Sequence, residues 1–352
     1  MTGAIHTGVG TMSGQSLAAV VLEFGGVSGL AVRPLLKRTL PRRGEIEVLV
    51  EAASVNPIDV RRRSGYGRRL FSLLGAATLP LVLGNDFAGT VTAVGPGVTN
   101  LREGDRVFGA KPPSSRGTHA THVIVRADHA VRQPRGVPAP VLATLPYNFL
   151  TVKRALADAG LAAGNAYQRQ VLVYGASGGL GLLAVWLLSS WGAHVTAIGS
   201  GAGLEACRAA GAAVILDRHR HALADVLPGF AATLNFACWE DEAALLRLLA
   251  PDALGHASTV HPLLGNFDSF GLLAGAVRTM WQKRQMRALA QTRYAWTVFR
   301  QDRVALQELA DCAAAIPAPA LSSLSLFDAA SAHRHVEQRR PGRAVLLPGR
   351  GL

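Results

Sequence analysis

The pattern of apolar and polar positions divides the chain into two parts near residue 145. In the first part, short apolar or alternating runs rich in β-branched residues are separated by glycine and proline, which is typical of strands in a small barrel or sandwich. The strands predicted there are Leu17–Glu23, Ile46–Ala53, Phe87–Val94, Arg106–Phe108 and His119–Val125. We therefore expect the first part to be rich in β-structure.

In the second part, runs of strand length alternate with runs of helix length. The predicted strands are Val171–Tyr174, His194–Ile198, Val214–Leu216, Thr233–Phe236 and Ala257–Val260. The predicted helices are Leu150–Ala159, Gly179–Trp191, Leu204–Ala210, Glu242–Leu249, Ala274–Phe299 and Val304–Ala315. Strands that alternate with helices imply a parallel, doubly wound sheet, so the chain belongs to the α/β class. One further strand is predicted at Arg343–Leu347.

A glycine-rich turn follows the first strand of this second part, with the sequence Gly175-Ala-Ser-Gly-Gly-Leu-Gly181. Gly178 lets backbone amides approach a pyrophosphate, and Gly181 lets the following helix pack closely on the strand. The unpaired N–H groups at the start of that helix attract phosphate. Although alanine replaces the usual first glycine, the turn predicts a dinucleotide site formed by Ala176, Ser177, Gly178, Gly179 and Leu180.

The residues after the next two strands bear on which dinucleotide is bound. An NAD site usually carries an acidic residue at the end of the second strand, where this chain has Ser200. Ser200 has no charge that would repel a 2′-phosphate, and Arg218 follows the third strand and could pair with that phosphate. Arg208 is a weaker candidate for the same role. These residues favour NADPH over NADH.

Composition and charge narrow the class of protein. The chain of 352 residues is long enough for two domains, and 49% apolar against 17% charged residues supports a large core. The formal net charge of +13 comes mostly from scattered arginines, so we do not predict nucleic-acid binding. Cys207, Cys238 and Cys312 lack the spacing of a disulfide framework or a thiolate metal site, which favours a reducing, cytoplasmic compartment.

No membrane span or targeting signal is predicted. The stretch Val171–Leu204 lacks acidic residues, lysine and arginine, but its glycine turn fits a buried strand followed by a buried helix better than a membrane helix. The first 30 residues contain no lysine or arginine, which excludes a signal peptide, and Met12 is taken as the first residue of the domain.

Several motifs occur in the order that one family has them. Together they resemble the zinc-independent quinone oxidoreductases of the medium-chain dehydrogenase/reductase superfamily. The Ser-Gly-Tyr-Gly sequence at residues 64–67 and Arg293-Tyr-Ala-Trp296 are most similar to the mitochondrial reticulon-interacting quinone reductase branch. The motifs are Val55–Gly67, Leu83–Val91, Gly104–Phe108, Leu145–Thr151, Gly175–Gly181, Leu216-Asp217 and Gly342–Val345.

The resemblance implies an architecture and a reaction. A GroES-like, β-barrel-type catalytic domain would span residues 12–145 and be completed by residues 317–352, and a Rossmann NADPH-binding domain would span residues 146–316. The active site would lie in the cleft between them. Hydride would pass from NADPH to a quinone or to the β-carbon of an α,β-unsaturated carbonyl. Dimers are usual in this family, so a homodimer is compatible with the resemblance.

The resemblance also assigns roles to individual residues. Tyr66 is the candidate donor to the substrate oxygen on which negative charge develops. Asn56 would hydrogen-bond that oxygen or the nicotinamide ribose, and Thr151 would contact the nicotinamide. Val260 and Arg343 complete the predicted cofactor contacts.

No metal site is predicted. Where zinc-dependent relatives have a cysteine, this chain reads Ser54-Val55-Asn56, and where they have a His-Glu pair it reads Asn85-Asp86. His119 and His122 would point to opposite faces of the predicted strand, so they are poor partners for a metal ion.

Two further functions remain open. The arginines that flank the Tyr66 segment could attract an anionic substrate such as a coenzyme A or carrier-protein thioester, or could be a solvated basic loop. The protein could then be an enoyl-thioester reductase, or a catalytically idle member that binds NADPH and interacts with a partner. These arginines are Arg61, Arg62, Arg63, Arg68 and Arg69.

Overall fold

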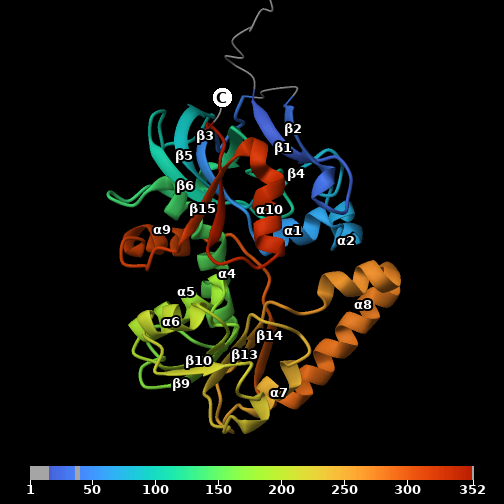
Figure 1. Ribbon diagram of the computed structural model, residues 1–352, viewed down its shortest axis with the longest axis vertical. Coiled ribbons are helices and arrows are strands. Elements are labelled where there is room, and N and C mark those ends of the chain that lie inside the picture. The colour runs from blue at the N-terminus through green and yellow to red at the C-terminus, as the bar shows by residue number, and fades with distance from the viewer. Residues whose placement is uncertain (1–15, 36–39, 351–352) are drawn as a thin grey trace, which may run out of the picture.

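The computed structural model describes residues 16–35 and 40–350, and its chain forms two parts, one above the other in Figure 1. The upper part is built mainly from the first 145 residues together with the C-terminal segment, and the lower part holds a parallel sheet flanked by helices. The predicted α/β class with a GroES-like and a Rossmann-type part is confirmed. The exact domain boundaries stay a prediction, and Met12 lies outside the described residues.

The upper part contains a seven-stranded and a three-stranded sheet. In the first, the strand order is β15-β16-β3-β5-β6-β8, with β7 paired to β3; in the second it is β2-β1-β4. The strands are β1 (Leu17–Val21), β2 (Leu30–Pro34), β3 (Glu45–Ser54), β4 (Leu81–Val82), β5 (Asp86–Val94), β6 (Arg106–Ala110), β7 (His122–Arg126), β8 (Ala130–Arg132), β15 (Leu321–Ser325) and β16 (Arg343–Leu347). The helices are α1 (Pro57–Arg63), α2 (Arg68–Leu73), α3 (Ala139–Leu142) and α10 (Ala329–Glu337).

The C-terminal segment completes the larger of these sheets. Strand β16 pairs antiparallel with β3, so that Val345 lies opposite Ser54, and it pairs parallel with β15. Arg343, the first residue of β16, is thereby held close to the end of β3. This pairing brings residues from the two ends of the sequence to one place.

The lower part is a six-stranded sheet in the order β11-β10-β9-β12-β13-β14, in which every pair is parallel. Its strands are β9 (Gln170–Tyr174), β10 (His194–Gly199), β11 (Val214–Asp217), β12 (Ala232–Asn235), β13 (Gly255–Ser258) and β14 (Arg293–Trp296). Its helices are α4 (Pro146–Asp158), α5 (Gly179–Ser190), α6 (Gly203–Ala209), α7 (Glu242–Arg247), α8 (Leu263–Ala290) and α9 (Arg303–Cys312). Short 3-10 turns lie at Val27–Gly29, Ala127–His129, Leu223–Asp225 and Leu326–Asp328. None of the helices in residues 16–35 and 40–350 is both long and apolar enough to cross a membrane.

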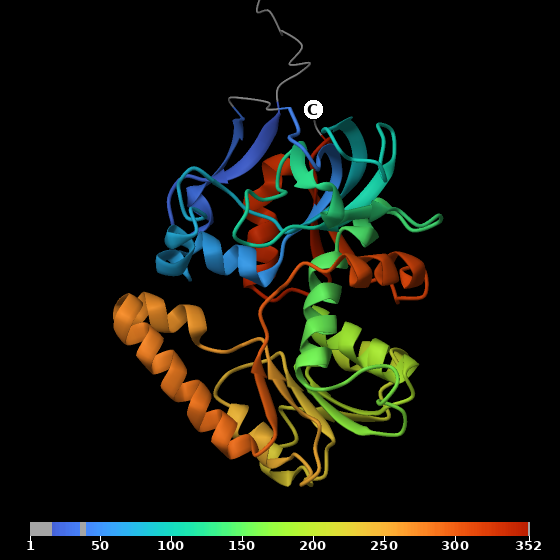
Figure 2. The same cartoon turned by 180° about the vertical axis from the view of Figure 1, so that it is seen from behind.

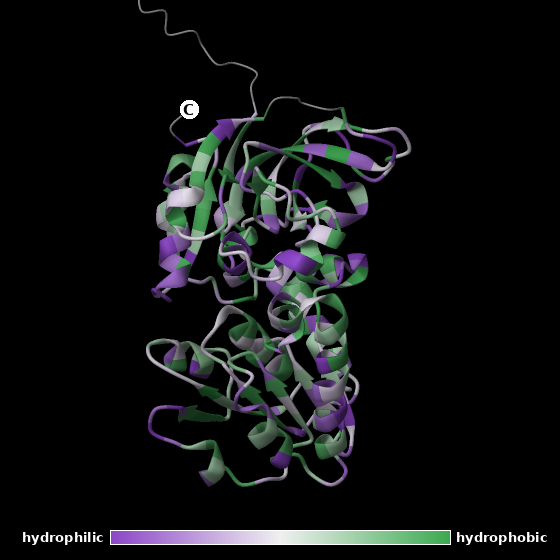
Figure 3. Cartoon of the chain, turned by 90° about the vertical axis from the view of Figure 1, so that its right-hand side faces the viewer, coloured by the Kyte–Doolittle hydropathy of each residue, from purple (hydrophilic) through white to green (hydrophobic). Residues whose placement is uncertain are grey.

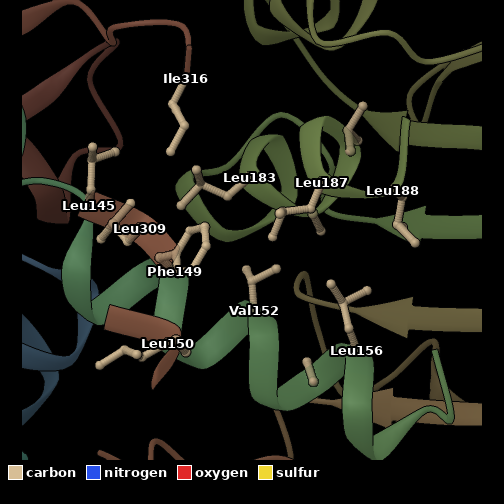
Figure 4. Packing of buried hydrophobic residues seen from close by; sticks show 14 of the residues in the cluster. Leu145, Phe149, Leu150, Val152, Leu156, Leu183, Leu187, Leu188, Leu309 and Ile316 are labelled. Carbon is tan, nitrogen blue, oxygen red and sulfur yellow. The ribbon is translucent and has the colours of Figure 1, made fainter. Parts of the chain in front are cut away.

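One hydrophobic core joins the two parts. Helix α4 carries Phe149 and Leu150, both at most 1% exposed, and they belong to a cluster that also includes Phe108 of β6 and Leu183 of α5. Figure 4 shows Phe149 beside Leu309 of α9, with Leu183 close by. Burying a leucine or phenylalanine stabilises a fold by about 1.5–3 kcal/mol, so this shared core holds the two parts against each other. Figure 3 shows hydrophobic segments along the strands of both parts.

The helix predicted at Ala274–Phe299 is wrong at both ends. Helix α8 begins at Leu263, is interrupted at Gly271 (φ 79°, ψ −176°) and ends at Ala290. Residues 293–296 form β14, the edge strand, in which Tyr294 and Trp296 alternate with more exposed neighbours and are both buried. No glycine or proline marks the end of the helix in the sequence, so the helical pattern was extended too far. Pairing with β13 and the burial of Tyr294 and Trp296 make this segment a strand instead.

The strand predicted at His119–Val125 also begins too early. Strand β7 starts at His122, and His119 lies before it, with its backbone N–H bonded to the carbonyl of Leu83. The prediction of opposite faces for His119 and His122 therefore rested on a strand that does not include His119. The elements α1, α2, α3, α10, β2, β4, β8 and β15 were not predicted.

Candidate active site

The glycine turn forms a close connection between β9 and α5. A Cβ atom on Gly181 would lie 2.3 Å from the carbonyl oxygen of Gly175 and 2.5 Å from the Cα of Ala176, so only glycine fits there. Gly178 is the N-cap of α5 and no side chain caps this end of the helix. Within the described residues, the N–H groups of Gly179 and Leu180 donate to no protein acceptor. The turn thus presents free amides at a helix N-terminus, which suits a pyrophosphate.

Ser177 ties the turn to the end of the second strand. Its hydroxyl accepts a hydrogen bond of 3.1 Å from the backbone N–H of Ser200. A Cβ on Gly203 would lie 2.6 Å from that of Ser177, so the close approach of α6 to the turn requires glycine at residue 203. The structure therefore holds Ser177 of the turn next to Ser200 at the end of β10.

Arg218 follows β11 directly, beside Ser200. Strands β10 and β11 are parallel with Gly199 opposite Asp217, and the N–H of Arg218 donates to the carbonyl of Gly199 over 2.9 Å. The Arg218 side chain is exposed. It can therefore turn towards an anionic group bound next to Ser200.

Arg343 connects the C-terminal strand with the cofactor turn. Its Nη1 would lie 2.3 Å from a Cβ on Gly179, so the turn leaves room for the guanidinium only because residue 179 is glycine. Its Nη2 donates to Oδ1 of Asn56 over 2.7 Å. With the Asn148 amide turned so that its oxygen faces the guanidinium, that oxygen accepts from Nη1 at 3.2 Å and Nη2 at 2.8 Å. Burial lowers the pKa of Arg343, and the carboxylates of Asp86 and Asp59 oppose that effect.

Asn56 is held on both sides of its amide. Its Nδ2 donates to Oδ2 of Asp86 over 2.7 Å and to Oγ of Ser54 over 3.1 Å, while its Oδ1 accepts from Arg343. Both amide hydrogens are therefore used, and one lone pair on Oδ1 remains. This geometry fits acceptance from a ribose hydroxyl and leaves no hydrogen for a substrate oxygen.

Asp86 lies at the centre of this network, although the sequence had suggested no role for it. Besides Asn56, its carboxylate accepts from Oγ of Ser54 over 2.8 Å and from the N–H of Tyr147 at the start of α4 over 2.6 Å. Burial raises the pKa of Asp86 to about 6, and these hydrogen bonds and the charge of Arg343 limit the rise. The signal in the sequence was the position of Asp86 in the motif Leu83–Val91, which follows β4 and includes the start of β5. Asp59 is also buried, and its carboxylate accepts from the backbone N–H groups of Asn56 and Gly84, which is a structural role.

Thr151 belongs to α4, and Val260 belongs to the segment between β13 and α8. The Thr151 hydroxyl donates to the carbonyl of Tyr147 over 2.7 Å, which leaves its oxygen free to accept. The Tyr147 ring stacks on Phe299 with centroids 4.5 Å apart, and burial raises the pKa of its hydroxyl. Val260 is half-buried and lies two residues after β13 ends.

Tyr66 lies at a different point of the junction. The Arg61 guanidinium lies 4.6 Å from its ring centroid, and a Cβ on Gly265 would lie 3.6 Å from its Cε2 and 4.0 Å from its hydroxyl. Tyr66 therefore faces the start of α8, across the boundary between the two parts. No hydrogen bond between described residues joins its hydroxyl to Asn56.

The arginine cluster separates into two kinds of residue. Arg62 and Arg63 are buried: Arg62 donates to the carbonyl of Ala76 over 2.6 Å, and Arg63 donates to Glu337 over 2.9 Å. Arg61, Arg68 and Arg69 are exposed. The five arginines are therefore not all part of a solvated loop, and they do not all belong to an exposed anion-binding cluster.

Comparison with known proteins places this geometry in a family. A family model described as alcohol dehydrogenase GroES-like domain matches residues 42–135. NAD(P)H oxidoreductase RTN4IP1, mitochondrial, of Homo sapiens is 31% identical over 285 residues, which cover 76% of this chain and 72% of that protein. The quinone oxidoreductase of Homo sapiens is 34% identical over 188 residues, which cover 52% of this chain and 53% of that protein.

Solved structures share the fold. The quinone oxidoreductase from Coxiella burnetii superposes with a TM-score of 0.78 at 22% identity and covers 95% of this chain and 99% of its own. The Escherichia coli quinone oxidoreductase complexed with NADPH has a TM-score of 0.73 at 22% identity, over 94% of this chain and 100% of its own.

The chain therefore belongs to the quinone oxidoreductase family of the medium-chain dehydrogenase/reductase superfamily, and it is an oxidoreductase. Within that family it is similar in particular to the mitochondrial NAD(P)H oxidoreductase RTN4IP1 of animals. The family resemblance stated from the motifs is confirmed.

Proposed function

We propose that this protein is an NADPH-dependent reductase that transfers hydride, without a metal ion, to a quinone or to the C=C bond of an α,β-unsaturated carbonyl. The observation that carries the proposal is Arg343, which contacts both the cofactor turn at Gly179 and the amide of Asn56. A dinucleotide bound at the turn would therefore have its nicotinamide end next to Asn56.

NADPH, when bound, supplies the hydride from its nicotinamide ring. The free amides of Gly179 and Leu180 would hold the pyrophosphate, with Ala176, Ser177 and Gly178 shaping the turn. Ser200 and Arg218 would hold the phosphorylated ribose. Asn56, Thr151 and Val260 would orient the nicotinamide end. Animal relatives are named NAD(P)H oxidoreductases, and the Escherichia coli neighbour is complexed with NADPH, which supports this cofactor.

The proposal of a metal-free reaction rests on the residues that stand where zinc-dependent relatives have metal ligands. Ser54, Asn56 and Asp86 hydrogen-bond to one another, and Arg343 places a positive charge beside them. Among the residues that the structure describes, no group of three or more His, Cys, Asp or Glu side chains could hold a metal ion. We infer that hydrogen-bond donors and positioning of the substrate carry the chemistry.

Reduction of an enone places the hydride on the β-carbon and negative charge on the carbonyl oxygen. Tyr66 is the proposed donor to that oxygen, because its hydroxyl lies at the junction and has no acceptor among the described side chains named above. The α-carbon or the oxygen would then take a proton from Tyr66 or from water, and a Tyr66 that has given its proton would regain one from water. The substrate gains one hydride, which carries two electrons, and one proton, which balances the reaction.

A substrate panel tests the proposal. NADPH oxidation is followed at 340 nm with benzoquinones, enones and enoyl thioesters of coenzyme A. Turnover with quinones or enones supports the proposal, whereas turnover confined to thioesters identifies an enoyl-thioester reductase. Tight NADPH binding without turnover on any acceptor identifies the idle, partner-binding alternative.

The Tyr66→Phe substitution tests the donor. Loss of the hydroxyl should lower kcat on the preferred acceptor by at least about 10-fold while NADPH affinity stays the same, because the donor acts on charge that develops during the reaction. Tyr167→Phe, at an exposed tyrosine, is the control and should leave kcat unchanged. An unchanged kcat in Tyr66→Phe would remove Tyr66 from the reaction and leave proton transfer to water.

The cellular setting is part of the proposal. Three scattered, unpaired cysteines support a reducing compartment such as the cytoplasm, while the animal relatives carry the word mitochondrial in their names. Fractionation of cells that express the full chain distinguishes the two. Light scattering of the purified chain tests the homodimer.

A further inference from the structure

Helix α2 and the bend of α8 expose large apolar side chains next to one another. Leu73 and Leu74 end α2 and are 63% and 60% exposed, and Phe270 and Leu273, on either side of the bend at Gly271, are 49% and 86% exposed. The two helices pack together, since Asp268 of α8 accepts from the backbone N–H groups of Gly67 and Arg69. We call this the tip surface, and Figures 1 and 2 show α2 lying directly above the start of α8.

The apolar surface continues along the outer face of α8. Val277, Met280 and Trp281 are 62%, 63% and 55% exposed and follow Leu273 at helical spacing. On the opposite face, Gly275 and Ala290 are buried. The helix is therefore packed on one side and exposes an apolar stripe on the other, which is uncommon for a surface that faces only water.

The charges around this surface are predominantly positive. Residues 60–85 and 269–301 contain no aspartate or glutamate. Arg68 and Arg69 are exposed on α2, and the Arg278 guanidinium lies 4.7 Å from the Phe270 ring centroid. The carboxylate that lies closest in sequence, Asp268, is occupied by the backbone of α2. Further basic residues on α8 are Lys283, Arg284 and Arg287.

We propose that the tip surface docks on the surface of an anionic lipid bilayer. Exposed leucine, phenylalanine and tryptophan side chains enter the boundary between headgroups and acyl chains, and the surrounding arginines contact lipid phosphates. The charge complementarity favours an anionic bilayer, because the excess of arginine and lysine beside the apolar residues is attracted to the negative potential of such a surface.

The tip surface lies next to Tyr66, so docking on a bilayer would bring the lipid close to the proposed donor. Gly67 follows Tyr66 and begins α2, and Tyr66 faces Gly265 at the start of α8. A bilayer bound at the tip surface would lie beside this part of the junction, so an apolar acceptor dissolved in lipid could reach it without crossing water. The docking itself does not depend on the reaction proposed above.

Vesicle flotation of the full chain tests the proposal. Vesicles of phosphatidylcholine with about one third phosphatidylglycerol are compared with vesicles of phosphatidylcholine alone, at low and at high salt. The variant Leu73→Glu/Leu273→Glu removes the apolar contact, and Leu227→Glu/Val304→Glu is the matched control, because those residues are 83% and 79% exposed elsewhere. Both variants are checked for unchanged NADPH oxidation with a water-soluble benzoquinone, so that failure of the reaction and failure of docking are distinguished.

Flotation of the native chain with anionic vesicles only, weakened by salt and reduced about 10-fold or more in the tip variant but not in the control, supports the proposal. Equal flotation of both variants overturns it, and so does the absence of flotation with anionic vesicles. If the tip variant instead converts a dimer into monomers in light scattering while vesicle binding stays unchanged, the surface is a contact between two copies and the proposal is wrong.

Discussion

The cofactor turn and the Asn56 network are built in opposite ways. The turn consists of seven consecutive residues, Gly175–Gly181, and offers backbone amides whose positions follow from the absence of side chains. The network consists of side chains from β3, β5, the segment after β3, α4 and β16, and its longest link joins residues 287 positions apart in the sequence. The first depends on local backbone geometry, and the second depends on the whole fold.

This difference determines how each region responds to change. A backbone site fails when a neighbouring residue adds volume, because amides cannot be shifted without moving the helix. A side-chain network fails when one donor or acceptor is lost, and its response depends on pH because Asp86 can be protonated. Substitutions at the two regions should therefore have distinguishable signatures.

The largest effect is expected from Gly181→Ala. Its Cβ would lie 2.3 Å from a backbone oxygen, so α5 must move, and both thermal stability and NADPH affinity should fall, the latter by about 10- to 100-fold. Gly178→Ala is the matched variant: its nearest protein atom would be 3.4 Å away, so stability should stay while NADPH affinity falls. Calorimetry with and without NADPH measures both. Equal loss of stability in the two variants would contradict the packing role of Gly181.

A smaller effect, confined to a pH range, is expected from Asp86→Asn. Burial raises the pKa of Asp86 to about 6, above its ordinary value of 3.8, so the folded protein holds this proton more tightly than the unfolded chain does. The stability that this preference contributes is present below pH 4 and is lost as the pH rises through 6, by an amount on the order of 3 kcal/mol. Asparagine does not titrate, so the native chain should lose stability relative to the variant between pH 4 and pH 7 in denaturant unfolding.

Activity gives a second test at the same residue. Protonation of Asp86 removes an acceptor from Asn56, Ser54 or Tyr147, so NADPH oxidation by the native chain should fall below pH 6. The variant should be less active at neutral pH but should lack this acidic limb. An identical pH profile in the two proteins would show that Asp86 does not control the network.

The smallest effect is expected from Arg218→Gln. This substitution removes a charged side chain at the edge of the cofactor turn, where the other contacts come from backbone amides. Because Arg218 is exposed, its pairing with a 2′-phosphate is weakened by solvent, and NADPH affinity should fall by about 3- to 10-fold while NADH affinity stays the same. Arg208→Gln is the control, since Arg208 pairs with Glu205 on α6. A parallel loss of both cofactors would contradict the 2′-phosphate role.

The comparison also explains what could be predicted from the sequence. The alternation of strands and helices from β9 to β13, and the turn between β9 and α5, depend on local patterns and were predicted within a few residues. Strand β14 was not, because Tyr294 and Trp296 become a strand only through pairing with β13 and burial. Helices α1 and α2 are short and lie in a segment rich in arginine, whose pattern does not distinguish helix from loop.

The candidate site shows the same division. Ser177 and Ser200 were both expected at the cofactor site from their places after the first two strands of the sheet, and they are hydrogen-bonded to each other. Asn56 and Arg343 were both expected at the site through the family resemblance, but their direct contact could not be deduced, since it requires the antiparallel pairing of β16 with β3. The central position of Asp86 and the split of the arginine cluster into buried and exposed members depend on packing that no single segment encodes.

The pairing of β16 with β3 has a consequence for biosynthesis. A ribosome makes Asn56 early and Arg343 287 residues later, so the nascent chain carries an Asn56 amide without its partner for most of translation. The glycine turn, by contrast, is complete once residue 181 has emerged. The backbone of the turn can therefore form before the chain has the guanidinium that joins the turn to Asn56, and that connection must await the synthesis of β16.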